Sequence, residues 1–415
     1  MATTPPLDVL VLGAGMVGVS TGLAARRRGL SVTVVDRREP GRETSYGNAG
    51  ILSSGSILPL NGPGLLTKLP TYLTNRHPAL RWRAGHVAAN WTWAARFLGH
   101  ARAPAPDPRE AALHGLIAPS LALHREWIPQ AGVGHRLRET GWLKVWRSDA
   151  YAAAQAEHDV LARFGIGSTV LDRQAISGLE PGILPIYPVG LLHTDTASVD
   201  SPGAIVEAYA RLYAAEGGAM RRAEVQGLRR EREDWVVQLD GAPLRARHVV
   251  VALGPWSGDL LATLGYRVPL GFERGYHQEF ETAPGLRLRR ALYDADGAFV
   301  ITPVENGTRL TTGVELAHRD APSSFAQLDI AIPKARAVLA FGDPVAEPWR
   351  GSRPTMPDSL PMIGPAPNHT GLWCAFGHQH IGFTSGPGTG AAIAAMIAGA
   401  PAPFDCAPFD PARFI

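Results

Sequence analysis

The first fifty residues carry the most regular hydrophobic pattern in the chain. Residues 8–12 form an almost continuous apolar run, which is typical of a central parallel strand covered on both faces. A helical stretch over about 16–28 follows and ends near Gly29, and the sequence SVTVVD then predicts a second strand that closes with Asp36. The pattern therefore predicts a strand–helix–strand unit.

The middle of the chain predicts a helix followed by a strand meander. In the sequence SVDSPG, Asp200 or Ser201 is expected to cap a helix whose first turn takes Pro202, and the helix should stop at Gly217–Gly218. The segments AEVQGLRR, DWVVQLDG and RARHVVVALG then predict three consecutive strands.

Two further patterns complete the expected architecture. Residues 297–315 predict a hairpin that turns at Asn306–Gly307, which we assign to a second, antiparallel sheet. Near the C-terminus, a strand at 372–376 precedes a glycine-rich loop and a helix that is expected to open at about Thr389. The chain thus contains a second strand–glycine loop–helix unit at its opposite end.

An aromatic segment at 81–100 predicts a helix of a second domain. It contains Trp82, Trp91, Trp93 and Phe97, so two interpretations are weighed. The helix could attach to a membrane surface through its apolar side. We prefer the alternative, in which the aromatic side chains pack inward.

Length and composition restrict the function classes. A chain of 415 residues favours two domains, and a net charge of +3 without a run of like charges excludes a nucleic-acid-binding arm. The two cysteines form no CxxC pair and the fourteen histidines are scattered, so no metal site is expected. Free thiols favour the cytoplasm, with peripheral attachment to the cell membrane left open.

The glycines after the first strand predict a dinucleotide site. Gly13, Gly15 and Gly18 have GxGxxG spacing, which provides a tight turn, close approach of a pyrophosphate and close helix–strand contact. The pyrophosphate would lie at the helix N-terminus, where free N–H groups and the dipole favour anions. Asp36 stands where a carboxylate binds ribose hydroxyls, which disfavours NADP. The motif alone does not separate NAD from FAD.

The polar loop ETSYGNAG, residues 43–50, directly follows this unit and begins a series of ordered motifs. The others are VVVALGPWS, SRPTMPDSLPMIG and GHQHIGFTSGPGTG. Together with the GxGxxG unit, they resemble the FAD-dependent D-amino acid oxidase superfamily, specifically its bacterial D-amino acid dehydrogenase branch. The resemblance runs from residue 8 to about 398.

The resemblance implies a two-domain α/β flavoprotein. A discontinuous, Rossmann-like FAD-binding domain would comprise 1–60, 196–262 and 346–415. An α+β substrate-binding domain with an antiparallel sheet would comprise 61–195 and 263–345.

The resemblance also implies the residues that contact FAD. Towards the nucleotide, the three glycines would hold the pyrophosphate, Asp36 and Arg37 would lie at the ribose, and the Val225 main chain would meet the adenine. Thr44 and Ser45 would hydrogen-bond the phosphates. Around the flavin ring, the implied residues are Asn48, Ala49, Gly50, Gly377, His378, Gly382, Phe383 and Thr384. The last three would offer backbone N–H groups to the pyrimidine end of the ring, where reduced flavin carries negative charge.

Arg353 is the expected anchor for a substrate carboxylate, because a guanidinium pairs with a carboxylate at two points and the family binds its substrate at this position. Arg350 is a weaker rival, and a surface ion pair between Arg353 and Asp358 is the alternative without a catalytic role. Tyr276 and His277 are expected on the strand that faces the flavin. His277 could accept the amine proton or simply pack within the strand.

The expected reaction is oxidation of a D-amino acid, or of a cyclic D-imino acid such as cis-4-hydroxy-D-proline, by hydride transfer to FAD. The imino product of a primary amine would hydrolyse to a 2-oxo acid and ammonia. None of the three lysines lies in a flavin-contacting motif, which favours a quinone or another carrier over oxygen as electron acceptor. No cysteine stands at Ser352–Arg353, so FAD should be non-covalent. The alternatives are a sarcosine- or glycine-type amine oxidase, an FAD subunit of an electron-transfer complex, and an NAD-dependent dehydrogenase.

Overall fold

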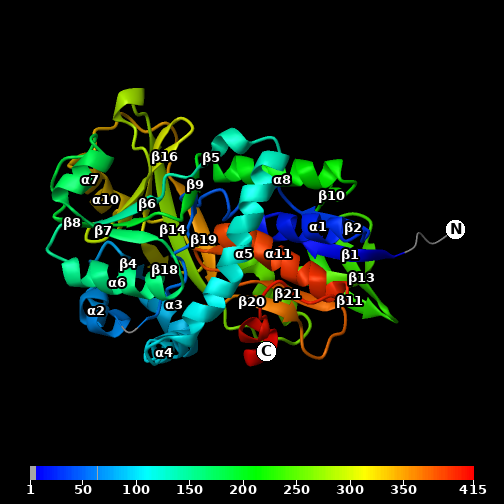
Figure 1. Ribbon diagram of the computed structural model, residues 1–415. Coiled ribbons are helices and arrows are strands. Elements are labelled where there is room, and N and C mark those ends of the chain that lie inside the picture. Colours follow the sequence, from blue (N-terminus) through cyan, green and yellow to red (C-terminus); the bar gives the residue numbers. More distant parts are fainter. Residues whose placement is uncertain (1–5, 63) are drawn as a thin grey trace.

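Two large sheets lie side by side in the computed structural model, which describes residues 6–62 and 64–415. The first sheet has the order β10-β2-β1-β13-β12-β11, and β21 pairs with both β13 and β20. It occupies the right-hand half of Figure 1. Its strands are β1 (Leu7–Leu12), β2 (Val32–Asp36), β10 (Ala219–Arg222), β11 (Val225–Glu231), β12 (Asp234–Leu239), β13 (Leu244–Val251), β20 (Met362–Pro365) and β21 (Leu372–Phe376).

The centre of the first sheet is buried on both faces, as its apolar runs require. In β1, Val9 and Val11 belong to the hydrophobic core on one face, and Leu10 and Leu12 belong to the core on the other face. The pairs β1–β2, β1–β13 and β13–β21 are parallel. The carboxyl ends of these strands therefore meet at one edge, where ligands of open α/β sheets bind.

The second sheet is mixed and lies in the left-hand half of Figure 1. Its order is β4-β18-β14-β17-β16-β15-β6-β8-β7, with β19 paired antiparallel to β14. Its strands are β4 (Leu80–Trp82), β6 (Trp142–Trp146), β7 (Ser168–Asp172), β8 (Val189–His193), β14 (Gly271–Phe280), β15 (Ala291–Asp294), β16 (Phe299–Val304), β17 (Gly307–Thr312), β18 (Val314–Leu316) and β19 (Trp349–Thr355). A small third sheet joins β3 (Ile51–Leu52), β9 (Ala197–Val199) and β5 (Leu137–Arg138).

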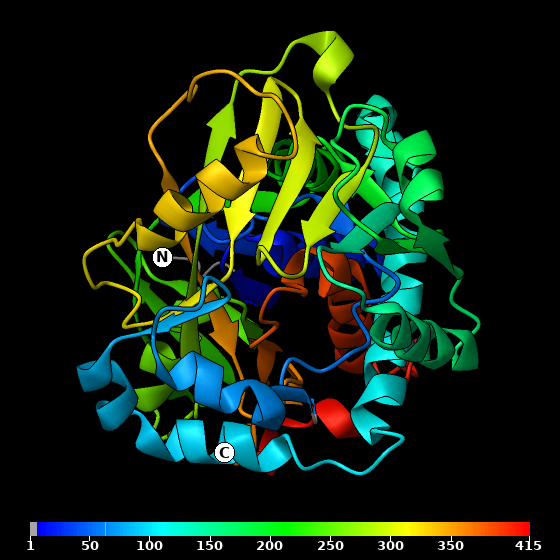
Figure 2. The same cartoon turned by 90° about the vertical axis from the view of Figure 1, so that its left-hand side faces the viewer.

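Three helices pack closely beside the first sheet: α1 (Met16–Arg27), α5 (Pro108–Gln130) and α11 (Gly382–Ile397). A Cβ added at Gly390 would lie 2.6 Å from the backbone of Ser20 in α1, and one at Gly388 would lie 2.2 Å from the Ser120 hydroxyl in α5. Glycine is therefore needed where α11 touches its two neighbours. In Figure 2 the yellow strands of the second sheet stand in front of α1 and α11.

The remaining helices surround the two sheets. They are α2 (Gly64–Leu73), α3 (Ala84–Ala89), α4 (Trp91–His100), α6 (Tyr151–Arg163), α7 (Arg173–Leu179), α8 (Pro202–Ala215), α9 (Ser257–Ala262) and α10 (Ala326–Arg336). Helix α10 packs its Leu328 into the hydrophobic core of the second sheet.

The strand meander, the hairpin over 297–315 and strand 372–376 are confirmed. The hairpin turns at Glu305–Asn306, one residue before the predicted Asn306–Gly307, because Gly307 already pairs with Val304. Helix α11 begins at Gly382, so its predicted start near Thr389 is wrong by two turns. Helix α8 takes Pro202 in its first turn after Ser201, but neither proposed cap is made by a side chain. Asp200 instead pairs with Arg136 at 2.9 Å.

The single helix predicted over 81–100 is wrong. The segment forms the end of β4, helix α3 and helix α4. Trp93 is 8% exposed and stacks on Phe97 with ring centroids 4.9 Å apart, whereas Trp91 is 66% exposed. The aromatic side chains therefore divide between the interior and the surface.

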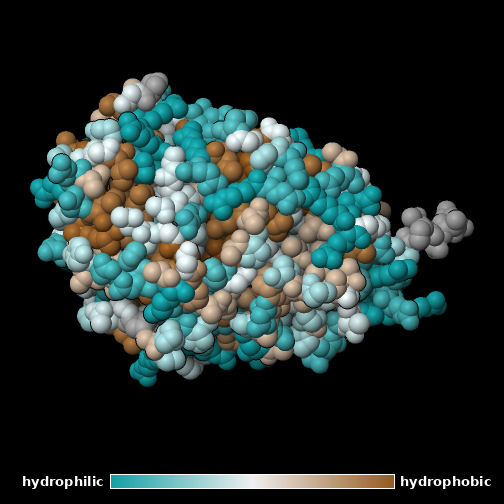
Figure 3. Space-filling view, viewed as in Figure 1, coloured by the Kyte–Doolittle hydropathy of each residue, from teal (hydrophilic) through white to brown (hydrophobic). Residues whose placement is uncertain are grey.

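Among the described residues, no helix has both the length and the apolar character needed to cross a membrane. On the face shown in Figure 3, hydrophobic side chains gather towards the left and centre and hydrophilic ones dominate the right. The most exposed large apolar side chains are Leu73, Trp91, Tyr151 and Leu184.

Candidate active site

A cavity of about 920 Å³ lies between the two sheets. This volume is at the upper end of ligand pockets, which span roughly 300–1,000 Å³. The N-terminal ends of α1 and α11 both border it, through Met16 and Val17 on one side and Gly382 and Phe383 on the other. Two chain segments more than 360 residues apart thus build one site.

The α1 end of the cavity is shaped for a pyrophosphate. Gly13 has a φ of +109°, and a Cβ there would lie 2.3 Å from the carbonyl oxygen of Ala252. Gly15 borders the cavity, and a Cβ there would meet only the Ser45 hydroxyl, at 3.3 Å. Gly18 does not line the cavity, because it packs against the Gly13 carbonyl. The glycines therefore form the turn and leave space at the start of the helix.

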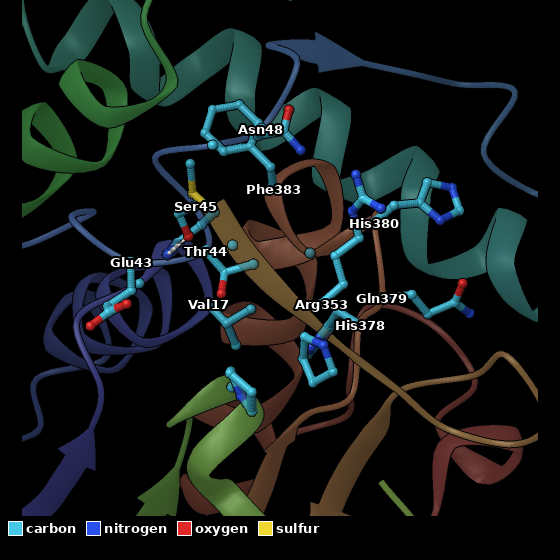
Figure 4. Close-up of a pocket in the computed structure, with 18 of the residues that line it drawn as sticks. Val17, Glu43, Thr44, Ser45, Asn48, Arg353, His378, Gln379, His380 and Phe383 are labelled. Carbon is cyan, nitrogen blue, oxygen red and sulfur yellow. Dashed lines mark hydrogen bonds between the residues drawn. The ribbon is translucent and has the colours of Figure 1, made fainter. Parts of the chain in front are cut away.

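The loop ETSYGNAG supplies polar groups beside this turn. The Ser45 hydroxyl accepts a hydrogen bond from the Met16 N–H at 3.0 Å, and the Thr44 hydroxyl donates to the Ser352 carbonyl at 2.9 Å. Both side chains line the cavity close to the start of α1 (Figure 4). Since the remaining N–H groups of the first turn lack a side-chain cap, an anion would be stabilised there.

Asp36, Arg37 and Val225 line the cavity beside this turn, at the end that we call the nucleotide end after its expected ligand. The Asp36 carboxylate accepts from the backbone N–H groups of Ala14 and Arg38, at 2.7 and 2.9 Å. Each carboxylate oxygen can accept a further bond, so the group can also bind ribose hydroxyls. The Arg37 guanidinium lies 4.4 Å above the Trp256 ring, and Trp256 also lines the cavity.

The wall expected beside a flavin ring is built from two segments. Asn48 and Ala49 border the cavity, and the Asn48 side chain accepts from the Gly50 N–H at 2.8 Å. Gly50 does not border it, and its glycine is needed because a Cβ would lie 2.3 Å from the Val199 carbonyl. Gly377, with a φ of +86°, and His378 line the opposite side.

The corrected start of α11 changes the interpretation of its glycine loop. Gly382, Phe383 and Thr384 are the first turn of the helix, border the cavity and have no side-chain cap. Their N–H groups lie where the helix dipole favours negative charge. Buried His124 holds this turn from behind, with its Nε2 3.0 Å from the Phe383 carbonyl.

Arg353 extends into the cavity beside His380 (Figure 4). Its guanidinium makes no hydrogen bond or ion pair within the described part of the chain. Burial lowers the pKa of Arg353, while Glu273 acts in the opposite direction. The proposed pairing with Asp358 is wrong, because Asp358 binds Arg413 at 2.7 Å. The rival Arg350 donates to the Ala321 carbonyl and does not line the cavity.

Tyr276 and His277 lie on β14 as predicted, but their side chains have other partners. The Tyr276 hydroxyl donates to Glu315 and accepts from Arg274 in a buried network. The His277 ring stacks on Trp349 with centroids 5.0 Å apart and does not border the cavity. Burial lowers the pKa of His277 to about 3. The amine-base role weighed for His277 is therefore unsupported, and its packing alternative fits the geometry.

Trp349 and Arg309 were missed in the sequence and hold the loop ETSYGNAG in place. The Trp349 ring lies where a Cβ at Gly47 would stand, 1.7 Å away. Tyr46 packs 6.1 Å from the same ring. Arg309 donates to the carbonyls of Tyr46 and Asn48, at 3.1 and 2.6 Å. Their contacts depend on strands distant in sequence, so no local motif indicated them.

Further lining residues were also missed, because they lie outside the ordered motifs. They include Trp142, Lys144, Glu157, Glu273 and Tyr293. Lys144 binds Glu157 at 2.5 Å, so a lysine does line the cavity although it lies in no flavin motif. No group of three His, Cys, Asp or Glu side chains able to hold a metal ion occurs within the described ranges.

One cavity thus joins the N-terminal turns of α1 and α11, the Asp36 carboxylate and the Arg353 guanidinium, which has no hydrogen-bond or ion-pair partner among the described residues. This combination is typical of a dinucleotide-dependent oxidoreductase. Residues 8–396 match the family described as FAD dependent oxidoreductase, and the chain belongs to this family. It is an FAD-dependent enzyme with the family's α/β fold.

Curated relatives match over nearly their whole length. The chain is 31% identical to a D-amino-acid oxidase of Bradyrhizobium diazoefficiens, with 98% of this chain and 99% of the relative covered. It is 30% identical to D-amino acid dehydrogenase 2 of Pseudomonas aeruginosa, with 96% of each covered. Among solved structures, glycine oxidase from Geobacillus kaustophilus superposes with a TM-score of 0.77 at 21% identity, over 99% of this chain and 100% of that one.

Proposed function

We propose that the protein oxidises the Cα–N bond of a D-amino acid, or of a cyclic D-imino acid such as cis-4-hydroxy-D-proline. The product of a primary amine is an imino acid, which hydrolyses to a 2-oxo acid and ammonia. The observation that carries the proposal is the Arg353 guanidinium, which borders the cavity and makes no hydrogen bond or ion pair with any residue that the structure describes. The names of the two curated relatives support a D-amino acid as substrate.

Arg353 binds the substrate carboxylate and thereby fixes the orientation of the Cα–H bond. FAD, when bound, accepts the hydride from the substrate α-carbon. The uncapped N-terminus of α11 stabilises the negative charge that this transfer brings into the cavity. Strands of the second sheet and Trp349 also line the cavity, and a substrate bound between them would displace water from the reacting atoms.

We further propose that FAD is held without a covalent bond and passes its electrons to a quinone or another carrier. Cys374 is buried in the core of the first sheet, and neither cysteine borders the cavity. Lys144 is paired with Glu157, which leaves it poorly placed to activate oxygen. An amine oxidase that forms peroxide is the second candidate, supported by the fold of glycine oxidase. The two free thiols favour a cytoplasmic location.

The domain division expected from the sequence assigns β19 to the FAD-binding domain, although this strand pairs with the second sheet. All strands of the first sheet fall within 1–60, 196–262 and 346–415. Strand β19 lies in the last of these segments but pairs with β14 in the second sheet. We propose that Arg353 is thus contributed by the C-terminal segment to the substrate side of the cavity.

A dye-reduction screen of D-amino acids, L-amino acids and cyclic imino acids, run beside a peroxide assay, tests the proposal. Dye reduction with D-amino or D-imino acids and little peroxide is the expected result. Reduction only by glycine or sarcosine, with stoichiometric peroxide, would establish the second candidate instead.

Arg353→Ala with Arg350→Ala as matched control tests the assigned anchor. Removing one partner of a buried charge pair costs about 2–5 kcal/mol, so kcat/KM should fall roughly 30- to 5,000-fold in Arg353→Ala. FAD content should stay unchanged. Arg350→Ala should remain within a few-fold of the wild type, and equal losses in both variants would remove the assignment.

A further inference from the structure

A second charged group, Glu273, lies beside Arg353 in the cavity. Strands β14 and β19 are antiparallel neighbours, and their register places Glu273 directly opposite Arg353. Both residues border the cavity. Glu273 is only 3% exposed, and its Oε2 has no hydrogen-bond partner in the part of the chain that the structure describes. A buried carboxylate oxygen without a partner is costly and points to a missing ligand.

The register alone would favour an ion pair between Glu273 and Arg353, but none forms within 4.0 Å in the described chain. The reason is Gly275, two residues farther along β14. A Cβ at Gly275 would lie 2.6 Å from Nη2 of Arg353, so the guanidinium lies over the glycine and away from the carboxylate. Because Gly275 has no side chain, the guanidinium of Arg353 has room above it and does not need to approach Glu273.

The two groups differ in sign and match the two charged groups of an α-amino acid. Arg353 offers donors to a carboxylate, and Glu273 offers an acceptor to an ammonium group. Burial raises the pKa of Glu273 to about 7, although Arg353 and the Thr355 side chain act to lower it. Near neutral pH this carboxylate can both attract an ammonium group and hold a proton taken from it.

We propose that Glu273 binds the substrate's ammonium group and accepts one of its protons. The inference rests on the proposed function and extends it. An N–H bond breaks and an O–H bond forms on Glu273, and the electron pair of that N–H bond stays on nitrogen. The nitrogen electron pair of the neutral amine then forms the C=N bond as the α-carbon gives up its hydride, for which FAD, when bound, would be the acceptor.

Two ligands of nearly equal shape test the inference by binding alone. 2-Aminoisobutyrate has no Cα–H and cannot be oxidised, and pivalate carries a methyl group in place of its ammonium group. Each is titrated into the holoenzyme and followed by the flavin absorbance spectrum. The wild type should bind 2-aminoisobutyrate at least about tenfold more tightly than pivalate.

Glu273→Gln should weaken 2-aminoisobutyrate until the two affinities are similar, without weakening pivalate. Glu281→Gln is the matched control, because Glu281 is exposed just beyond the end of β14. It should keep the wild-type preference. If Glu273→Gln keeps that preference as well, the inference is overturned.

Glu273→Asp covers the case in which Glu273→Gln loses FAD or fails to fold. It retains the negative charge and should retain part of the preference for the ammonium ligand. Loss of the preference in a folded Glu273→Asp holoenzyme counts against the inference. Failure of the proposed function looks different, because the wild type would then bind neither ligand and no amino acid would reduce its flavin.

Discussion

The two ends of the cavity satisfy their polar groups in different ways. At the nucleotide end, Asp36 and Ser45 accept hydrogen bonds from neighbouring backbone N–H groups. At the opposite end, Arg353 and Oε2 of Glu273 have no hydrogen-bond partner among residues 6–62 and 64–415. One end is held in shape by the chain itself, whereas the other keeps two charges that form no ion pair with each other and can each bind a ligand. The first suits a resident cofactor, and the second suits a substrate that enters and leaves.

The largest expected effect is loss of FAD binding after a substitution at the nucleotide end of the cavity. In Gly15→Val the branched side chain would occupy the space in front of α1 that Gly15 leaves open. We expect purified protein without FAD, measured as loss of flavin absorbance per chain. Gly85→Ala is the control, since a Cβ at Gly85 meets nothing within 4 Å. A Gly15→Val protein that still purifies with bound, yellow FAD would contradict the proposed pyrophosphate site at the start of α1.

A substitution at the substrate end of the cavity should lower kcat/KM without loss of FAD. In Gly275→Ala the new methyl group would stand 2.6 Å from Nη2 of Arg353 and displace the guanidinium. We expect kcat/KM to fall by about 10- to 100-fold, because misplaced anchors cost that much, while flavin content stays constant. Gly227→Ala on β11 has open space around the new methyl group and should change neither quantity.

Local and long-range structure explain why the sequence predicted one end better than the other. GxGxxG, Asp36 and the hydroxyls of residues 43–50 act through short spacings, so a motif identifies them. Along β14, alternation separates Glu273 from Tyr276, yet both border the cavity, so the strand pattern alone does not tell which residues reach it. The pairing of Glu273 with Arg353 joins positions 80 residues apart and was not predicted.

The start of helix α11 was also mispredicted because it depends on contacts with segments distant in sequence. Its first residues, GFTSGPGTG, have low helical propensity and were therefore assigned to a loop. The structure makes them helical because α1 and α5 approach so closely that only small side chains fit. Tertiary packing here outweighs local preference.

The pH dependence of kcat/KM should report the ionisation of Glu273 at the substrate end. Because Glu273 must be ionised to bind ammonium and its pKa is about 7, kcat/KM should fall about tenfold per pH unit below that value. The neighbouring groups do not change charge just below pH 7. Arg353 stays charged, Thr355 is neutral, and burial lowers the pKa of His380 to about 4. Glu273→Gln should lose this acid limb. A limb that persists in the variant would assign it to another group.

The smallest expected effect is on stability. The pKa of Glu273 is raised in the folded state, so its contribution favours folding in acid and is lost as the pH rises through about 7. Glu273→Gln should therefore be more stable than the wild type at pH 8, by about 1–3 kcal/mol, and similar to it at pH 4. Thermal unfolding of both proteins at the two pH values measures the difference, and a variant less stable at pH 8 would contradict it.

Arg309 connects the two halves of the molecule, because this β17 side chain holds the carbonyls of Tyr46 and Asn48. A cofactor that immobilises residues 43–50 will therefore also slow the opening of the second sheet. Amide hydrogen exchange in β17 should become slower when FAD is added to the apoprotein, and both sheets should melt in one cooperative transition.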